Sequence, residues 1–154
     1  VVPAAGMGTR FLPATKTVPK ELLPVVDTPG IELIAEEAAA LGAARLAVVV
    51  APKKEEIMRH FGEFAELQEL MVSRGKDEQA FKVARAGGLI EAVAVTQDTP
   101  LGLGHAVGCA ESALDADEDV VAVMLPDDLV LPAGVMDKMV AVRAQLGGLG
   151  VVRV

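Results

Sequence analysis

Hydrophobic stretches alternate with helical patterns along the chain. Residues 46–50 form a continuous apolar run, which is typical of a parallel strand covered on both faces. Similar stretches at 90–95 and 120–125 predict two more strands, and Val1-Val2 has the composition of the end of a first one. Because these strands alternate with helical segments, the pattern predicts an α/β sandwich with a mostly parallel sheet and right-handed crossovers. In such sheets ligands bind outside the carboxyl ends of the strands.

The first helix is predicted to begin at Pro29, because a Thr N-cap, here Thr28, followed by Pro at the first helical position is a common helix start. Gly42 is placed to end this helix. Its buried face is expected to repeat every three to four residues. That face consists of Ile31, Ile34, Ala38 and Leu41.

The rest of the chain contains the other predicted helices. Residues 53–72 are helical in type with an interruption at Gly62, whereas 73–89 is predicted to be a polar connection that contains glycine. Two further helices are expected at 106–114 and 132–146.

One domain is predicted over residues 1–146, with a strand-like stub at 147–154 after a glycine cluster. The stub and the abrupt start at Val1 indicate an incomplete chain, or one in which a segment is missing before the stub. No apolar run approaches the roughly 20 residues needed to cross a bilayer, and the first residues do not have the pattern of a signal peptide. The chain is therefore expected to be cytoplasmic, with no membrane partner.

The composition excludes several classes of function. The 154 residues carry a formal net charge of −8, and aromatic residues make up 3% of the chain, with no Trp or Tyr. Nucleic acid is therefore not expected as a partner, because proteins that bind it usually have a basic surface and aromatic stacking residues. A single Cys109 excludes an internal disulfide, and a chain with two histidines does not suit a His-rich zinc site.

The first twenty residues carry the opposite charge from the rest of the chain. They contain Arg10, Lys16 and Lys20 and no acidic residue, which gives +3. The remaining 134 residues therefore carry −11, the total of −8 less the +3 of this window. Such a basic segment is either a solvated surface run or a binding site for an anion.

A loop that contains glycine follows the first strand and precedes Arg10. Gly6 and Gly8 allow backbone amides to approach an anion closely, because no Cβ intervenes and positive φ angles are accessible. The GxGxxG dinucleotide motif would need glycine where the chain has Phe11, and the Gly-Lys-Ser/Thr ending of a P-loop is absent from the sequence. The loop is therefore either an ordinary turn or a phosphate-binding loop of another kind.

The residues after the loop favour phosphate binding. A guanidinium group at Arg10 can bind a polyphosphate through two hydrogen bonds, and Lys20 can reach a different phosphate as a point charge. Lys16 is an auxiliary cation on the same segment. Prolines stiffen the segment and so hold its charges at fixed positions; they are Pro13, Pro19 and Pro24.

Three stretches of this segment carry a family resemblance: Ala5-Gly6-Met7-Gly8-Thr9-Arg10, Pro13-Ala14-Thr15-Lys16 and Pro19-Lys20-Glu21-Leu22-Leu23-Pro24-Val25. Together they resemble the signature of the bacterial UTP:glucose-1-phosphate uridylyltransferases, or UDP-glucose pyrophosphorylases, within the sugar nucleotidyltransferases. The resemblance implies the nucleotide-diphospho-sugar transferase fold, a Rossmann-like three-layer sandwich with a mostly parallel sheet. It also implies that Gly8, Thr9 and Arg10 hold the β- and γ-phosphates, while Lys20 bridges the α-phosphate and the sugar phosphate.

A second stretch, Gln97-Asp98-Thr99-Pro100-Leu101-Gly102-Leu103-Gly104-His105-Ala106, resembles the base-recognition loop of the same family. A glutamine amide offers a donor and an acceptor to the edge of uracil. The resemblance implies that the base is contacted by Gln97, by the backbone near Gly102, and by backbone groups of Ala5 and Gly6. His105 is expected to have a structural or supporting role rather than to act as a catalytic base.

Two adjacent acidic residues, Asp127 and Asp128, follow the strand predicted at 120–125. This arrangement suits Mg²⁺, which binds through one or two carboxylates together with substrate phosphates. Successive side chains of an extended chain point in opposite directions, so one of the pair is expected to ligate. The resemblance selects Asp127 as the metal ligand, with Asp128 holding the loop or facing the sugar. The alternative for the pair is a turn and a helix cap before Pro132.

The resemblance implies transfer of a uridylyl group from UTP to glucose 1-phosphate, which gives UDP-glucose and pyrophosphate. Arg10 and Lys20 would be the catalytic residues, Mg²⁺ the cofactor and a homo-oligomer the assembly. The family has a longer second half with sugar-binding residues that are not present here. Two alternatives stay open: a nucleotidyltransferase that uses dTTP, ATP or CTP with another sugar phosphate, and a non-catalytic nucleotide-binding subunit.

Overall fold

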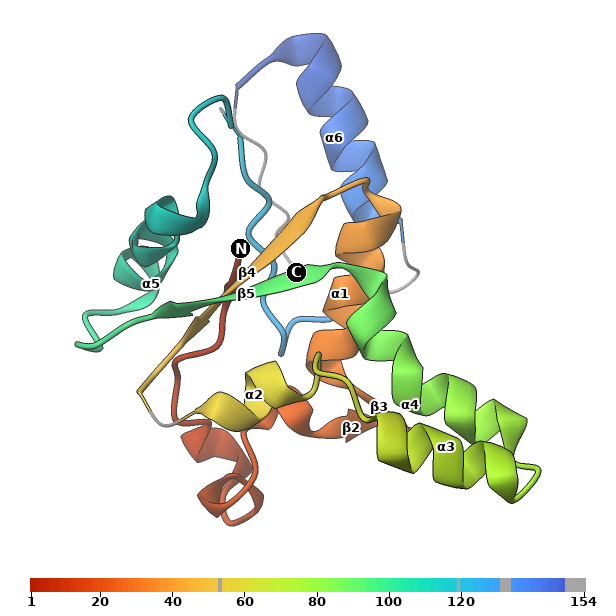
Figure 1. The fold of residues 1–154 in the computed structure, drawn as a ribbon. Coiled ribbons are helices and arrows are strands. Elements are labelled where there is room, and N and C mark those ends of the chain that lie inside the picture. The colour runs from red at the N-terminus through yellow and green to blue at the C-terminus, as the bar shows by residue number, and fades with distance from the viewer. Residues whose placement is uncertain (53, 119, 131–133, 149–154) are drawn as a thin grey trace.

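Strands and helices alternate along the chain and form an α/β sandwich (Figure 1). The computed structural model describes residues 1–52, 54–118, 120–130 and 134–148. Helices lie on both sides of a parallel sheet, so the structure has three layers. This confirms the predicted α/β class, with a mostly parallel sheet in a Rossmann-like arrangement.

The sheet has three parallel strands in the order β1 (Val2–Pro3), β4 (Arg45–Val50) and β5 (Glu91–Thr96). β1 pairs with β4, and all six residues of β4 pair with those of β5. The strands predicted at 46–50 and 90–95 are therefore confirmed.

Two hydrophobic cores form, one on each face of the sheet, because successive side chains of β4 point to opposite sides. The first core packs β4 against α1 (Gly30–Ala40), and the second packs it against α5 (Leu103–Cys109). The five apolar side chains of β4 are at most 7% exposed, as expected for a strand covered on both faces. The first core takes Leu46, Val48 and Val50 from this strand, and the second takes Ala47 and Val49.

The segment predicted as a strand at 120–125 is extended and lies beside β1. The nitrogen of Val1 donates to the Ala122 carbonyl at 2.7 Å, and the Met124 amide donates to the Val1 carbonyl at 3.0 Å. This is the hydrogen-bond pattern of neighbouring parallel strands. Among the described residues, however, these bonds reach Val1 alone, so the prediction of a regular strand is wrong. Met124 is buried, whereas the valines of the segment are 37–43% exposed.

Helix α1 begins later than predicted. Its N-cap position is Pro29, whose side chain cannot accept a capping hydrogen bond. The helix starts here because the residues before it belong to a hairpin. In that hairpin, β3 (Thr28–Pro29) pairs with β2 (Pro24–Val25). The prediction of Thr28 as the N-cap is therefore wrong, since its backbone is extended and pairs with β2.

The C-terminal end of α1 follows the prediction. Gly42 has a φ angle of 80°, and its amide donates to the Ala39 carbonyl at 3.0 Å. The Ala43 amide donates to the Ala38 carbonyl at 3.1 Å. This pair of bonds is the glycine-terminated Schellman motif. The predicted buried face is largely confirmed, with exposures of at most 4% for Ile31, Ile34 and Ala38.

The segment between β4 and β5 contains three helices: α2 (Glu55–Arg59), α3 (Ala65–Ser73) and α4 (Asp77–Leu89). The interruption predicted at Gly62 separates α2 from α3. The polar connection predicted at 73–89 is wrong, because α4 occupies most of it.

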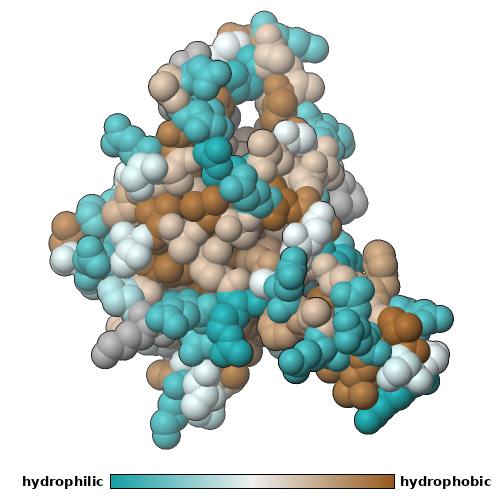
Figure 2. Space-filling view, viewed as in Figure 1, coloured by the Kyte–Doolittle hydropathy of each residue, from teal (hydrophilic) through white to brown (hydrophobic). Residues whose placement is uncertain are grey.

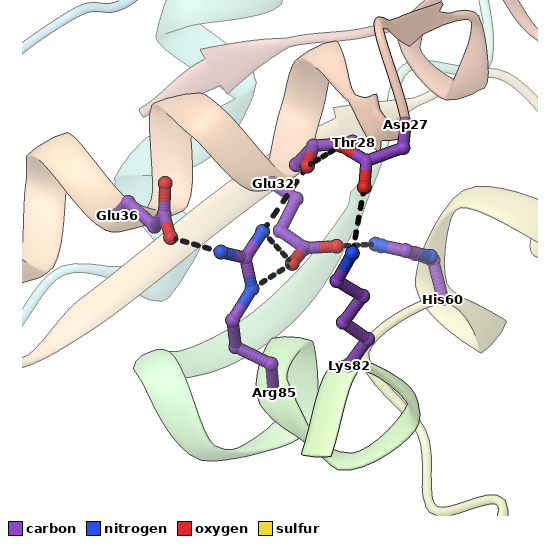
Figure 3. Close-up of polar contacts among 7 residues, drawn as sticks. All are labelled: Asp27, Thr28, Glu32, Glu36, His60, Lys82 and Arg85. Atoms are coloured by element: carbon purple, nitrogen blue, oxygen red, sulfur yellow. Dashed lines mark hydrogen bonds and ion pairs between the residues drawn. The ribbon is translucent and has the colours of Figure 1, made fainter. Parts of the chain in front are cut away.

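A buried polar cluster holds α4 against α1 (Figure 3). Glu32 of α1 is 4% exposed; it accepts a hydrogen bond of 2.6 Å from Arg85 of α4 and lies 2.7 Å from His60 Nε2. Arg85 also lies 2.8 Å from Glu36, so its guanidinium group bridges two carboxylates one helical turn apart. More exposed ion pairs extend the cluster from Lys82 to Asp27 and Glu78.

The remaining helices follow β5. α5 continues into a 3-10 helix at Ala110–Ala113, and together they match the helix predicted at 106–114. α6 spans Val135–Leu146. The start predicted for this helix, residue 132, lies outside the described residues, and so does most of the stub at 147–154.

Hydrophobic residues gather in the middle of the face shown in Figure 2, with hydrophilic residues around them. Leu67 and Leu70 of the helix α3 are also exposed, at 45% and 41%. Among the described helices, none is long and apolar enough to cross a membrane.

Candidate active site

The order of the strands reverses between β1 and the segment 120–125. From β1 the sheet grows on one side through β4 and β5, whereas 120–125 returns to the other side of β1. In open α/β sheets ligands bind at such a reversal, outside the carboxyl ends of the strands. The loop after β1 and the turn that contains Asp127 both leave the sheet at this edge.

Three of the predicted site residues meet there: Arg10, Lys20 and Asp127. Lys20 Nζ lies 2.8 Å from Asp127 Oδ1, and Arg10 Nη2 lies 3.2 Å from Asp127 Oδ2. Each carboxylate oxygen therefore has a cation from the N-terminal segment beside it. The Lys20 side chain is 14% exposed and that of Arg10 is 84% exposed, so Lys20 is much the more confined of the two.

The charges of this cluster favour the ionised form of Asp127. Partial burial opposes the negative charge, but the hydrogen bond and the charge of Lys20, together with the charge of Arg10, bring the pKa of Asp127 below its ordinary value of 3.8. The first residue of α1, Gly30, packs closely against this turn, since a Cβ on it would lie 3.0 Å from the Pro126 carbonyl oxygen. Asp127 is thus a charged carboxylate at neutral pH in a closely packed turn.

Gly8 brings the loop after β1 against Lys20. Its φ angle is 64°, and a Cβ there would lie 3.0 Å from Thr15 Cγ2 and 3.1 Å from Lys20 Cβ. Thr15 Oγ1 donates to the Gly8 carbonyl at 2.7 Å. Positive φ and close packing together explain why glycine stands at this predicted phosphate-loop position.

Lys54 is a site residue that was not predicted from the sequence. Its ammonium group donates to the carbonyls of Ala4 and Gly6 at 2.8 and 2.5 Å and lies 3.4 Å from Glu21 Oε2. It thus joins the loop after β1 to the 3-10 helix Lys20–Leu22. The signal in the sequence was its place shortly after β4, because the carboxyl ends of neighbouring parallel strands meet at one edge.

The carboxyl group of Glu21 is fully buried beside Lys54. Burial raises the pKa of Glu21, while the charges of Lys54 and Lys20 oppose that rise. Oε2 faces Lys54, whereas Oε1 has no hydrogen-bond partner among the described residues. A buried carboxylate depends strongly on its cation, so this ion pair fixes Glu21 and, through it, the backbone next to Lys20.

The predicted base-recognition residues form a second group at the end of β5. Gln97 is 5% exposed, and its backbone amide donates to the Val50 carbonyl at 2.8 Å. Its side-chain Nε2 lies 3.2 Å from the Gly102 carbonyl oxygen and 2.9 Å from His105 Nδ1. The structure therefore brings Gln97, Gly102 and His105 together, and it gives His105 a partner.

Other predicted residues have fewer contacts. Among the described residues, the side chains of Thr9 and Lys16 form no hydrogen bond or ion pair, and both residues are exposed. Ala5 lies between the two residues whose carbonyls accept from Lys54. Asp128 contributes its backbone amide, which donates to the Leu125 carbonyl at 3.1 Å and closes the turn.

A family model described as nucleotidyl transferase matches residues 1–152 of the chain. The chain belongs to the nucleotidyl transferase family. Within it, the chain is 44% identical over 130 residues to the UTP–glucose-1-phosphate uridylyltransferase of Bacillus subtilis (strain 168), which covers 84% of this chain and 44% of that relative. A relative of the same name from Staphylococcus haemolyticus (strain JCSC1435) is 41% identical over 130 residues, with the same coverage. The chain spans less than half the length of these curated relatives.

Solved structures agree with this assignment to the nucleotidyl transferases. The chain is 34% identical to a UDP-glucose pyrophosphorylase from Acinetobacter baumannii, with a TM-score of 0.82 that covers 94% of this chain and 52% of the other. A structure described as UTP-bound UGPase from the same organism has the same identity, score and coverage. The resemblance to uridylyltransferases predicted from the sequence motifs is therefore confirmed.

The described residues of this nucleotidyl transferase fit Mg²⁺ bound by one carboxylate together with substrate phosphates. The described residues contain no group of three or more His, Cys, Asp and Glu side chains suited to a metal ion. Asp127 is a single ionised oxygen donor at the ligand-binding edge of the sheet. Mg²⁺ is usually bound in this way, through one or two carboxylates with substrate phosphates as further ligands.

Proposed function

We propose that this nucleotidyl transferase chain binds UTP and supplies the phosphate-binding part of a site that transfers the uridylyl group to glucose 1-phosphate. The proposal rests on one observation, the convergence of Arg10 and Lys20 on Asp127 at the reversal of the sheet. Two cations and one carboxylate at this place suit a metal-bound triphosphate. Similarity to UTP–glucose-1-phosphate uridylyltransferases supports UTP as the nucleotide and glucose 1-phosphate as the acceptor.

In the proposed reaction an oxygen of glucose 1-phosphate attacks the α-phosphorus of UTP. A new bond forms between these two atoms. At the same time the α-phosphorus loses its bond to the oxygen that links it to the β-phosphate, and pyrophosphate leaves with the electron pair of that bond. The nucleophile is already an anion, so no side chain needs to remove a proton. The protein must hold two anions in line and neutralise the charge that develops.

Lys20 and Arg10 differ in the part they can play. We expect the confined Lys20 to lie between the α-phosphate and the sugar phosphate, where a fixed charge lowers the barrier most. Arg10 is 84% exposed, and an exposed ion pair such as Arg10–Asp127 is worth about 0–1 kcal/mol. A triphosphate can therefore draw Arg10 away from Asp127 at little energetic cost. Gly8 and Thr9 would then hold the outer phosphates together with Arg10.

Asp127 would hold Mg²⁺ in this site, and the ion, when bound, supplies positive charge against the phosphate oxygens. The chain's own residues provide the geometry. Lys54 fixes the loop after β1 and, through Glu21, the backbone beside Lys20. These contacts hold Lys20, rather than the exposed Arg10, in place at the carboxyl edge of the sheet.

Replacement of Lys20 by Ala tests the proposed function. In the protein that carries this chain, we expect Lys20→Ala to lower the rate of UDP-glucose formation by about a hundredfold or more, because a fixed charge at the reacting phosphate is lost. Lys16→Ala, on the same segment and without an ion pair among the described residues, is expected to lose no more than about threefold. Circular dichroism verifies that both variants fold. A near-normal rate for Lys20→Ala would contradict the proposal.

The nucleotide is tested by measuring pyrophosphate release with UTP, dTTP, ATP and CTP in turn. We expect the highest kcat/KM with UTP. Preference for another nucleotide would favour the sister nucleotidyltransferase, and UTP binding without release of pyrophosphate by the full protein would favour the non-catalytic subunit.

A further inference from the structure

The contacts around Gln97 determine which way its amide group faces. Gln97 Nε2 lies 3.2 Å from the carbonyl oxygen of Gly102. A carbonyl oxygen accepts hydrogen bonds and cannot donate, so the NH₂ group of Gln97 must be the part that faces Gly102. The reverse orientation would set two acceptor oxygens against each other in a side chain that is 5% exposed.

This orientation fixes the proton on His105. The same Nε2 of Gln97 lies 2.9 Å from His105 Nδ1. Since the NH₂ group donates, Nδ1 must accept, and the neutral imidazole carries its proton on Nε2. Cys109 Sγ, on the next turn of α5, lies 3.9 Å from both ring nitrogens.

Both N–H bonds of the Gln97 amide are therefore used within the protein. One goes to Gly102 and the other to His105. The remaining polar atom is Oε1, for which the described part of the chain provides no hydrogen bond. A base that meets this side chain finds an acceptor and no donor.

We propose that His105 is a positioning residue that fixes the amide of Gln97 and so selects nucleobases with an N–H at the recognised edge. Uracil and thymine carry an imide N–H at ring position 3, whereas cytosine has an unprotonated nitrogen there. This inference rests on the proposed function, UTP binding, and on the expectation from the sequence resemblance that Gln97 contacts the base. It narrows the expectation drawn from the sequence, where the amide offered both a donor and an acceptor.

The first test needs no nucleotide. The chain contains two histidines, so nitrogen NMR of the chain labelled with ¹⁵N-histidine gives two sets of ring signals, and those missing from His105→Asn belong to His105. We expect neutral His105 to carry its proton on Nε2. A proton on Nδ1 would overturn the role of His105 even in a protein that binds UTP.

The second test compares UTP and CTP affinities by isothermal titration calorimetry. We expect His105→Leu to reduce the preference for UTP over CTP by about tenfold, which corresponds to one net hydrogen bond. His105→Asn keeps an oxygen acceptor close to the position of Nδ1 and is expected to restore the preference to within about threefold of the wild type. Ser112→Ala, in the 3-10 helix after α5, is the control for general disturbance of this region.

The outcomes separate the two proposals. Equal affinity of the wild type for UTP and CTP would overturn base recognition through Gln97 and, with it, the role of His105. A wild type that prefers UTP and a His105→Leu variant that prefers it equally would leave the proposed function in place and overturn the positioning role. Loss of preference in His105→Asn as large as in His105→Leu would show that the acceptor is not what positions the amide, which also overturns the inference.

Discussion

Among single residues, Lys54 has the main structural role in the candidate site, because its one ammonium group links two separate segments. It donates to two carbonyls of the loop after β1 and faces the buried carboxyl group of Glu21, next to Lys20. The motifs predict Arg10, Lys20 and Asp127 because their residue types bind phosphate and Mg²⁺. Lys54 belongs to none of these motifs, and two of its three partners are backbone carbonyls, which residue types do not reveal.

We expect Lys54→Met to lower the free energy of unfolding by about 3 kcal/mol, because it leaves the carboxylate of Glu21 buried without a cation. The double variant Lys54→Met/Glu21→Gln is expected to recover part of this loss, because the buried charge is then removed. Urea denaturation of the chain measures both. Lys16→Met, on an exposed side chain, is the control and is expected to change the free energy by less than about 0.5 kcal/mol.

The pH dependence of the Lys54→Met variant gives a further check with a definite sign. Burial raises the pKa of Glu21 above its ordinary value of 4.5. A raised pKa means that the folded state favours the protonated form of Glu21. The contribution of protonated Glu21 to the free energy of unfolding is therefore present below pH 4.5 and is lost as the pH rises through the folded pKa. The deficit of Lys54→Met should therefore shrink as the pH falls toward 4.5. A deficit that does not depend on pH would show that it arises from the loop carbonyls and not from Glu21.

At the scale of elements, the attachment of α4 to α1 depends on Arg85. Its guanidinium group is held by the buried Glu32 and by Glu36, whereas Lys82 on the same helix pairs with exposed carboxylates (Figure 3). We expect Arg85→Met to lower the free energy of unfolding by about 3 kcal/mol, because Glu32 loses its principal cation. Lys82→Met should lower it by less than about 1 kcal/mol. Urea denaturation compares the two, and equal losses would contradict this account of the cluster.

The same helix shows where prediction of elements from the sequence stops. Strands 46–50 and 90–95 were predicted because a buried parallel strand needs a continuous apolar run. α4 was not predicted, because residues 73–89 are polar and contain glycines, which suggested a connection. One of these glycines, Gly87, lies close to the turn before α3: a Cβ there would lie 3.1 Å from the Phe61 carbonyl oxygen, so a side chain would require the turn to shift. From a single sequence, a glycine that allows close packing of a helix cannot be distinguished from a glycine that ends one.

At the scale of the whole molecule, the alternation of strands and helices was enough to predict a parallel sheet with a candidate site at its carboxyl edge. It did not place β1 in the middle, with 120–125 on one side and β4 on the other. That order brings Asp127 next to Arg10 and Lys20 although over a hundred residues separate them. The juxtaposition is a property of the topology, so the motifs alone could predict its members but not their contacts.

This juxtaposition predicts that the effect of Asp127 on UTP binding changes sign with Mg²⁺. The lowered pKa keeps Asp127 negatively charged at neutral pH, so in the proposed site it would compete with the phosphates for Arg10 and Lys20. In EDTA, Asp127→Asn should therefore bind UTP more tightly, by about fivefold, because that competition is removed. With Mg²⁺ it should bind UTP more weakly, by about tenfold, because a metal ligand is lost.

Isothermal titration of the chain with UTP in the two buffers measures this reversal. Asp128→Asn makes the same change of charge one residue away and removes no ion pair among the described residues, so its effect should be smaller and of the same sign in both buffers. If Asp127→Asn weakened UTP binding equally with and without Mg²⁺, Asp127 would act by holding the turn. If it strengthened binding equally in both, the residue would act through its charge alone, and the metal ligand would have to lie elsewhere. Reversal of sign is therefore the result that distinguishes a carboxylate shared between the protein's own cations and a metal ion from one that serves only the fold.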